Sequence, residues 1–345
     1  MRRFSGKENF MPYQIWNRRY TGSKYKLSNW ITELITDNCK GTSFCDIFAG
    51  TAVVSKHMID YVDDIYINDF LYSNEIIYKG FFEQSEYDVN KLTRILEYIK
   101  GLNSDNISKN YISENYGNKY FSYNDSILIG NIREYIQESK DLNDKEKAIL
   151  IASLLFSADK AANTVGHYDA YIKGKDIPDC FKFDLISPYQ YPDKRIHISR
   201  KDANVLAKEI QCDIVYIDPP YNSRQYSRFY HVLENIATWK KPELFGVACK
   251  PREENMSDYC RTAATKVFDD LITSLKCKYI AVSYNNTYNS KSSSSRNKIT
   301  LEELERVLSK RGTVHRFEKA HQAFNAGKTE LNNHKEFLFL VKVGE

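Results

Sequence analysis

The sheet and its site are decided by the stretch Asp213-Ile214-Val215-Tyr216-Ile217-Asp218-Pro219-Pro220-Tyr221. Its first part, 213–217, is a short apolar run, which predicts a buried strand. This strand places Asp218 and the two prolines at its carboxyl end, where open α/β sheets bind their ligands. The stretch therefore predicts both an α/β sheet and the position of a site on it.

The residues after that strand carry the chemistry of the predicted site. Pro219 and Pro220 fix φ and lack N–H donors, so the backbone is stiff and its carbonyls are free to accept hydrogen bonds. The Asp218 carboxylate is a further acceptor, and Tyr221 adds an aromatic face. Together these groups suit a flat ring that bears an exocyclic amine. The alternative is an ordinary loop in which the prolines stop the strand and Asp218 is a turn residue.

The segment upstream reads as the start of a parallel sheet. A strand over 43–48, a helix over 52–61 and a strand over 64–68 follow one another, as in α/β folds. Further strands are expected at 195–199, 278–283, 314–317 and 336–343, and further helices at 27–35, 145–158, 262–275 and 301–308. Residues 70–192 lack this alternation and are expected to form a mainly helical insertion in a domain made of 12–69 and 193–345.

Two further segments indicate a nucleoside ligand. After the first strand the chain reads Asp46-Ile47-Phe48-Ala49-Gly50-Thr51, where Gly50 allows close approach of the backbone. Asp69 ends the next strand, a place typical of an acid that binds ribose hydroxyls. Neither G-x-G-x-x-G nor G-x-x-x-x-G-K-[ST] is present, so we expect no pyrophosphate. A plain strand–turn–helix is the alternative.

The third segment, Tyr20-Thr21-Gly22-Ser23-Lys24, precedes the first helix. A glycine turn and a lysine at a helix N-terminus can bind a carboxylate, although a solvated lysine explains the pattern as well.

Composition limits the class of protein. The 345 residues are 42% hydrophobic and 27% charged, as in globular proteins, and the net charge of +4 permits an anionic partner. No apolar run approaches the ~18 residues of a membrane span, and we expect a cytoplasmic protein without a membrane partner. Seven cysteines without a C-x-x-C pair argue against disulfides and structural zinc. The histidine spacing predicts no metal site.

The three segments, in this order, resemble those of the Dam-like, alpha-group N6-adenine DNA methyltransferases of bacterial restriction–modification systems. The resemblance covers 12–69 and 195–345, and it implies a Rossmann-like sheet that binds S-adenosyl-L-methionine. The residues after Tyr221 look closest to methylases of type IIS systems. One departure is F-A-G-T-A where the family commonly has F-x-G-x-G, so that Ala52 stands in place of the second glycine.

The resemblance implies a role for each segment. The lysine lies near the methionine carboxylate of the cofactor, the F-A-G-T turn wraps its methionine part, Asp69 holds its ribose, and Asp202 contacts its adenine. The implied cofactor-binding residues are Tyr20, Thr21, Gly22, Lys24, Asp46, Phe48, Ala49, Gly50, Thr51, Asp69, Asp202 and Asp218. The implied catalytic residues, which hold a target adenine flipped out of double-stranded DNA, are Asp218, Pro219, Pro220 and Tyr221.

DNA contacts are expected in two places. The loop after the catalytic motif supplies Asn222, Arg224, Gln225, Tyr226 and Arg228, which mix phosphate-binding and base-reading side chains. The insertion, a candidate target-recognition region, supplies His167, Tyr168 and Lys173. A cognate restriction endonuclease is a candidate partner.

Two other functions stay open at this point. A methyltransferase of the same fold that acts on an RNA base or a protein glutamine more often shows N-P-P-Y, so Asp218 favours DNA adenine. A catalytically silent DNA-binding module is the second alternative, and the intact D-P-P-Y motif argues against it.

Overall fold

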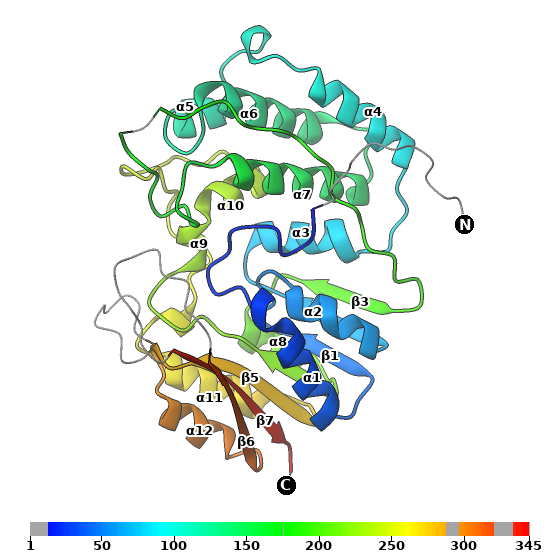
Figure 1. Ribbon diagram of the computed structural model, residues 1–345, viewed down its shortest axis with the longest axis vertical. Helices are drawn as coiled ribbons and strands as arrows, with labels where there is room; N and C mark the ends of the chain where they lie inside the picture. The colour runs from blue at the N-terminus through cyan, green and yellow to red at the C-terminus, as the bar shows by residue number, and fades with distance from the viewer. Residues whose placement is uncertain (1–12, 175, 288–296, 321–333, 345) are drawn as a thin grey trace.

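The computed structural model describes residues 13–174, 176–287, 297–320 and 334–344 (Figure 1). Over these residues the chain forms a mixed α/β fold around one seven-stranded sheet. The strands are β1 (Ser43–Asp46), β2 (Asp64–Asn68), β3 (Arg195–Ser199), β4 (Ile214–Ile217), β5 (Tyr279–Asn285), β6 (Val314–Ala320) and β7 (Lys335–Lys342). The α-helices are α1 (Ser28–Asn38), α2 (Val53–Met58), α3 (Tyr72–Phe82), α4 (Val89–Lys100), α5 (Tyr111–Tyr116), α6 (Tyr123–Glu138), α7 (Asp144–Ala161), α8 (Ala203–Glu209), α9 (Tyr226–Phe229), α10 (His231–Thr238), α11 (Ala264–Ser274) and α12 (Leu301–Leu308).

The sheet is mostly parallel, which confirms the predicted fold class. Its strands lie in the order β3-β2-β1-β4-β5-β7-β6. Strands β1 to β5 run parallel, whereas β7 is antiparallel to both of its neighbours. Three strand ends differ from the prediction by two residues or more. β5 continues to Asn285, which pairs with Glu336 of β7. β1 stops at Asp46 because the chain begins its turn toward α2 there, and β6 continues to Ala320 because it pairs with β7 along its whole length.

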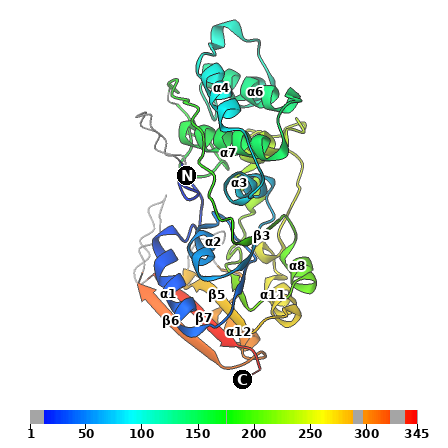
Figure 2. The same ribbon diagram turned by 90° about the vertical axis from the view of Figure 1, so that its right-hand side faces the viewer.

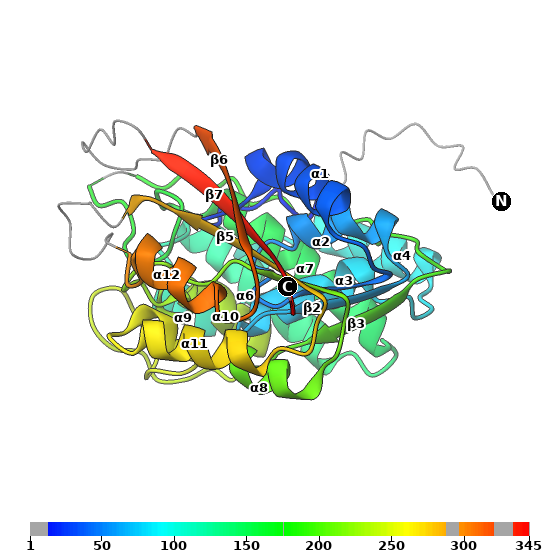
Figure 3. The same cartoon turned by 90° about the horizontal axis from the view of Figure 1, so that it is seen from below.

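Helices cover both faces of the sheet, as a parallel sheet requires (Figure 2, Figure 3). Alternation along β1 sends Phe44 to the layer of α1 and α2, where it shares a core with Ile31. Cys45 points to the layer of α8, α11 and α12, where it shares a core with Leu271. No helix in the described part of the chain combines the length and apolar character needed to cross a bilayer.

Three acidic residues meet at one edge of the sheet. Asp46 at the end of β1 pairs in register with Ile67 of β2 and with Tyr216 of β4. Asp69 and Asp218 each follow two residues after these partners, so the parallel strands deliver all three carboxylates to the same edge. The strand order changes direction between β1 and β4, which is where doubly wound sheets hold ligands.

A helical lobe stands above this edge. Helices α4 to α7 form it, and α3 lies between the lobe and the sheet (Figure 1). Helix α10 comes from the chain after D-P-P-Y, yet it packs against α3 and α7. Glu234 of α10 accepts hydrogen bonds from the backbone N–H groups of Tyr72 (3.0 Å) and Ser73 (2.8 Å) at the start of α3. The lobe therefore includes residues outside 70–192, and the recognition role of that range stays a prediction.

Helices α3 and α7 cross closely at Gly80. A Cβ atom at Gly80 would lie 3.0 Å from the Cβ of Ala152 and 3.1 Å from the carbonyl oxygen of Ala148. Lys145 of α7 fastens the same crossing, because its Nζ donates to the carbonyls of Lys79 (2.7 Å) and Gly80 (2.9 Å) near the end of α3. Burial lowers the pKa of Lys145 to about 8. The crossing thus joins the lobe to the helix that borders the site.

We expect Gly80→Leu to lower the free energy of unfolding by about 1–3 kcal/mol, because a larger side chain overpacks the helix crossing. Urea unfolding followed by circular dichroism measures this change. Gly101→Leu is the matched control, since a Cβ at Gly101 meets its nearest atoms at ordinary distances of 3.5 and 3.7 Å. Equal stabilities of the two variants would contradict the account of the crossing.

Candidate active site

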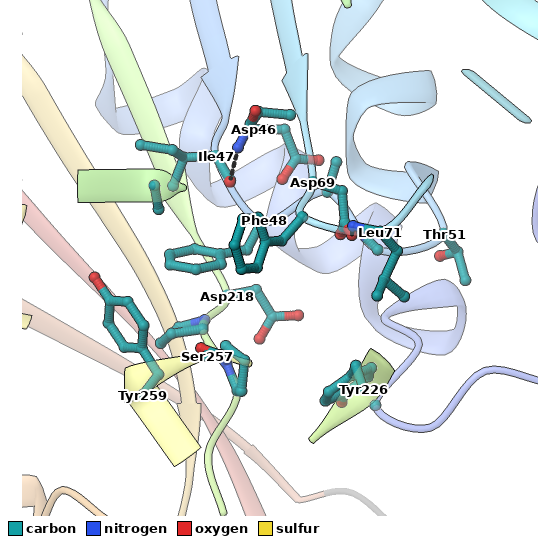
Figure 4. Close-up of a pocket in the computed structure, with 18 of the residues that line it drawn as sticks. Asp46, Ile47, Phe48, Thr51, Asp69, Leu71, Asp218, Tyr226, Ser257 and Tyr259 are labelled. Carbon is teal, nitrogen blue, oxygen red and sulfur yellow. Dashed lines mark hydrogen bonds between the residues drawn. The ribbon is translucent and has the colours of Figure 1, made fainter. Parts of the chain in front are cut away.

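An open cavity lies at the carboxyl edge of the sheet. Figure 4 shows Asp46 and Asp69 on one side of it, Tyr226 and Ser257 on the other, and Asp218 between them. All the residues expected to bind the cofactor or the target base line this cavity: Tyr20, Thr21, Gly22, Lys24, Asp46, Phe48, Ala49, Gly50, Thr51, Asp69, Asp202, Asp218, Pro219, Pro220 and Tyr221. The fold therefore brings together segments that lie almost 200 residues apart in the chain.

An ion pair occupies the centre of the cavity wall. The Nζ of Lys24 lies 2.9 Å from Oδ1 of Asp218 and donates to the hydroxyl of Tyr221 at 2.9 Å. Lys24 is buried, and burial alone would lower its pKa, but the carboxylates of Asp218 and Glu336 outweigh that effect and raise it. Lys24 is therefore a charged ammonium that contacts the Asp218 carboxylate, whereas the sequence suggested a cofactor carboxylate or solvent as its partner.

Tyr221 is held within this group of side chains. Its hydroxyl donates to Oδ1 of Asp218 and lies 3.3 Å from the carbonyl oxygen of Ser283 in β5. Its ring meets the ring of Tyr284 edge-on, with centroids 4.7 Å apart. Burial, followed by the nearby Asp218 carboxylate, raises the pKa of Tyr221 well above its usual value. Lys24 and Tyr221 both engage Oδ1, and among the described residues no hydrogen bond to Oδ2 is found.

The turn after β1 depends on backbone conformations that favour glycine. Gly50 has a φ of +55°, and a Cβ there would lie 3.2 Å from the ring of Tyr20. Its carbonyl accepts hydrogen bonds from Arg18 (2.6 Å) and Tyr78 (2.7 Å). Ala52 also has a φ of +55°, the left-handed region that costs a non-glycine residue about 1–2 kcal/mol. The position where the family commonly has glycine is thus one where glycine is physically preferred.

Two carboxylates border this turn. Asp69 accepts hydrogen bonds from the backbone N–H groups of Gly50 and Leu71, both at 2.9 Å, and so ties the turn to the end of β2. Asp46 accepts one hydrogen bond from Ser55 (2.7 Å), and its buried Oδ1 has no partner among the described residues. Burial raises the pKa of Asp46 to about 7. A buried acceptor of this kind invites a donor from a ligand.

The N-terminal segment is fastened to the chain after D-P-P-Y. The ring of Tyr20 stacks on that of Tyr230, with centroids 4.9 Å apart. The backbone N–H of Thr21 donates to the Tyr230 hydroxyl (2.7 Å), and the Tyr226 hydroxyl donates to the Thr21 carbonyl (2.9 Å). A Cβ at Gly22, where φ is +80°, would lie 3.1 Å from the Tyr226 hydroxyl oxygen. These contacts set the position of Lys24.

The far end of the cavity contains residues that the sequence did not indicate. The ring of Tyr259 meets Phe48 edge-on at 5.0 Å, and its hydroxyl donates to Asn204 at 2.7 Å. Ser257 lies beside it (Figure 4). Asp202 is exposed at this end, and its Oδ1 caps α8 by accepting from the N–H of Asn204 at 2.9 Å. No local motif marks Ser257 and Tyr259, because a loop far along the chain brings them there.

The residues expected to bind DNA fall into two groups. All but Tyr168 keep some surface available, namely Asn222, Arg224, Gln225, Tyr226, Arg228, His167 and Lys173. His167 stacks on the ring of Phe229 with centroids 4.6 Å apart, so the insertion and the loop after D-P-P-Y lie side by side. Arg224 lies over the same ring at 5.7 Å.

Tyr168, Gln225 and Tyr226 make contacts within the protein. The expected DNA contact of Tyr168 is wrong, because its side chain is 0% exposed and its hydroxyl donates to Asp159 at 2.9 Å. The side-chain amide of Gln225 hydrogen-bonds to the backbone of Ser257. Its Nε2 donates to the Ser257 carbonyl (2.9 Å), and its Oε1 accepts from the Ser257 N–H (2.7 Å). Tyr226 lines the cavity and anchors Thr21.

Known proteins with similar sequences are DNA methyltransferases. The chain is 31% identical to the type II methyltransferase M.NlaIII of Neisseria lactamica, over 92% of this chain and 95% of that protein. It is 29% identical to the type II methyltransferase M.CviAII of Paramecium bursaria Chlorella virus 1, over 94% and 98% of the two chains. It is 30% identical to M.FokI of Planomicrobium okeanokoites, where the match covers 94% of this chain but 52% of the relative.

A family model agrees with these pairwise similarities. The model of the D12 class of N6 adenine-specific DNA methyltransferases matches residues 20–289, which include the N-terminal segment, the turn after β1 and the D-P-P-Y motif. These are the segments that line the cavity. The chain therefore belongs to the D12 class N6 adenine-specific DNA methyltransferase family.

Proposed function

We propose that this DNA methyltransferase takes its methyl group from S-adenosyl-L-methionine and places it on N6 of an adenine flipped out of double-stranded DNA. The observation that carries the proposal is the Asp218 carboxylate in the cavity, with Oδ1 held by Lys24 and Tyr221 and Oδ2 left to accept a hydrogen bond. An acceptor-only group in this position matches an exocyclic amine.

The part of the cavity around β1 and β2 fits the cofactor. It is lined by Asp46, Phe48, Gly50 and Asp69, which combine acceptors, an aromatic ring and close backbone approach. Asp46 offers a buried acceptor without a partner among the described residues, and Gly50 leaves space that a side chain would fill. Asp69 is placed for ribose hydroxyls and Asp202 for the adenine end. When bound, the cofactor supplies an electrophilic methyl group on a sulfonium.

The part around D-P-P-Y fits the target base. The lone pair of adenine N6 is delocalised into the ring, so the amine is a weak nucleophile. If Oδ2 of Asp218 and the carbonyl of Pro219 accept its two hydrogens, electron density at N6 rises, and the carboxylate stabilises the positive charge that develops. Because this amine is out of reach inside a duplex, the base has to leave the stack. The Tyr221 ring offers a face for it.

The surface beside the cavity is proposed to contact DNA. Arg224, Arg228 and Asn222 follow the catalytic motif, and His167 of the insertion stacks on Phe229 beside them, while Lys173 is exposed a short way further along the insertion. Charged side chains here would position the phosphates, while the amide and imidazole groups reach base edges. The relatives named above are type II methyltransferases, so we propose a cognate restriction endonuclease as partner and the cytoplasm as the place of action.

Asp218→Ala should abolish methyl transfer while leaving cofactor binding nearly unchanged. The loss should reach about 1000-fold or more, the size expected when a group that stabilises developing charge is removed. Transfer of labelled methyl groups to DNA measures the rate, and calorimetry with S-adenosylmethionine measures binding. Asp60→Ala, on the surface at the end of α2, is the control. A near-wild-type rate in Asp218→Ala would show that another group accepts the amine.

Asp69→Ala should weaken binding of S-adenosylmethionine by about 10–100-fold, because hydrogen bonds to a charged group contribute about 1.5–3 kcal/mol. Calorimetry measures the affinity. Asp69 also holds the N–H groups of Gly50 and Leu71, so Asp69→Asn, which keeps an acceptor oxygen, controls for loss of the turn. Unchanged affinity in Asp69→Ala would rule out the ribose role.

Lys173→Ala should weaken binding of duplex DNA and reduce the slope of log K against log salt concentration by about 1, the change expected for one lost phosphate contact. Fluorescence anisotropy over a salt series measures the slope. Lys40→Ala is the control, since Lys40 is exposed before β1, at the opposite edge of the sheet. The same slope in Lys173→Ala and Lys40→Ala would remove this residue from the interface.

A further inference from the structure

An acidic residue, Glu336, precedes the apolar middle of β7 near the active site. In β7 the residues that follow Glu336 are Phe337, Leu338, Phe339, Leu340 and Val341, all of them buried. Alternation along the strand sends Phe337 and Phe339 to the layer of α11 and α12. It sends Leu338 and Leu340 to the layer of α1. Glu336 shares the second direction, toward the layer in which Lys24 lies just before α1.

Glu336 is a costly residue to bury in this position. Its side chain is 9% exposed, and its Oε2 has no hydrogen-bond partner among the described residues. A buried carboxylate without compensation is strongly unfavourable. Burial raises the pKa of Glu336 to about 7, Lys24 lowers it and Asp218 raises it further. The cation that compensates Glu336 is thus the same ammonium that contacts Asp218.

Lys24 is accordingly faced by two carboxylates on different strands. Asp218, after β4, contacts Nζ directly at 2.9 Å, whereas Glu336, on β7, acts on it at longer range. An ammonium that is buried beside a single carboxylate is attracted toward that carboxylate alone. A second carboxylate on a different strand of the same sheet attracts Lys24 as well, while its Nζ contacts Oδ1 of Asp218.

We infer that Glu336 is a positioning residue of the methyltransferase: its carboxylate holds the Lys24 ammonium, and through Lys24 it fixes the Asp218 carboxylate with Oδ2 toward the target amine. The inference rests on the proposed role of Asp218. Glu336 touches neither the base nor the cofactor in this account, and it is absent from the cavity lining.

Other charged and titratable groups surround Glu336. Nε2 of His334 lies 3.9 Å from its Oε1. Lys319 of β6 is its register partner, and the Nζ of Lys319 lies over the ring of Trp30 at 5.7 Å. From β4 and the chain after it, Tyr216, Asp218 and Tyr221 face the same region, and their interactions with Glu336 are among those that raise the tyrosine pKa values.

The test compares Glu336→Gln with Glu336→Asp and with the control Glu318→Gln on the exposed face of β6. The measurements are kcat, the KM values for DNA and S-adenosylmethionine, and the dependence of kcat on pH. Glu336→Gln should lower kcat by up to about 100-fold, the effect of roughly 1 Å of misplacement, with little change in either KM. Glu336→Asp should recover part of the loss.

The pH profile separates positioning from mere support of the fold. The pKa of Glu336 is raised to about 7, so its charge is present above that pH and is lost as the pH falls through it. Wild-type kcat should therefore decline on the acidic side of about pH 7, and Glu336→Gln should remove this decline. Asp46 also has a pKa of about 7, and an unchanged decline in Glu336→Gln would assign it to Asp46 and contradict the inference.

The remaining outcomes are also decisive. If Glu336→Gln does not fold, Glu336→Asp is measured instead. A Glu336→Asp variant that has the wild-type kcat, and whose kcat declines at the same pH as that of the wild type, would contradict the inference. If Asp218→Ala is inactive while Glu336→Gln matches Glu318→Gln, only the positioning role fails. If Asp218→Ala is active, the proposed function fails first.

Discussion

A buried ion pair between Lys24 and Asp218 is the interaction on which the site depends. An ammonium and a carboxylate inside a protein are each expensive to desolvate, and they persist there because each compensates the other. The pair joins a segment that precedes α1 to the end of β4, so it can form only when the sheet is complete. The pair engages Oδ1 of Asp218, and no hydrogen bond to Oδ2 is found among the described residues. That free acceptor converts a structural ion pair into a group that can bind an amine.

The parallel sheet explains why the other functional groups gather around this pair. Strands β1, β2 and β4 end at one edge, so Asp46, Asp69 and Asp218 arrive there from three separate parts of the chain. Two contacts join the helical lobe to that edge. Glu234 of α10 accepts hydrogen bonds from the start of α3, and the ring of Tyr20 stacks on that of Tyr230. A DNA duplex bound by the lobe would therefore be held at a fixed distance from the cavity, which positioning catalysis requires.

Much of this arrangement could be predicted from local patterns. Asp218, Gly50 and the strands around them belong to short motifs in which an apolar run ends at a turn. Such motifs predict local structure from neighbouring residues alone, without knowledge of the rest of the fold. The partner of Lys24 could not be predicted in this way, because a contact between residues 24 and 218 depends on the packing of the whole sheet. Ser257, Tyr259 and Glu336 reach the site from a loop and a strand whose sequences carry no signal. For Tyr168 the local pattern suggested a DNA contact that the structure does not support. A tyrosine after a glycine turn can contact DNA or be a buried donor, and Tyr168 donates to Asp159.

The function proposed for this cavity is the transfer of a methyl group to the amine of adenine. The most direct measurement incubates the protein with duplex DNA and S-adenosylmethionine that carries a deuterated methyl group, and then analyses the nucleosides by mass spectrometry. We expect deuterated N6-methyladenine and no other labelled nucleoside. Label on cytosine, or unlabelled adenine, would contradict the proposed function.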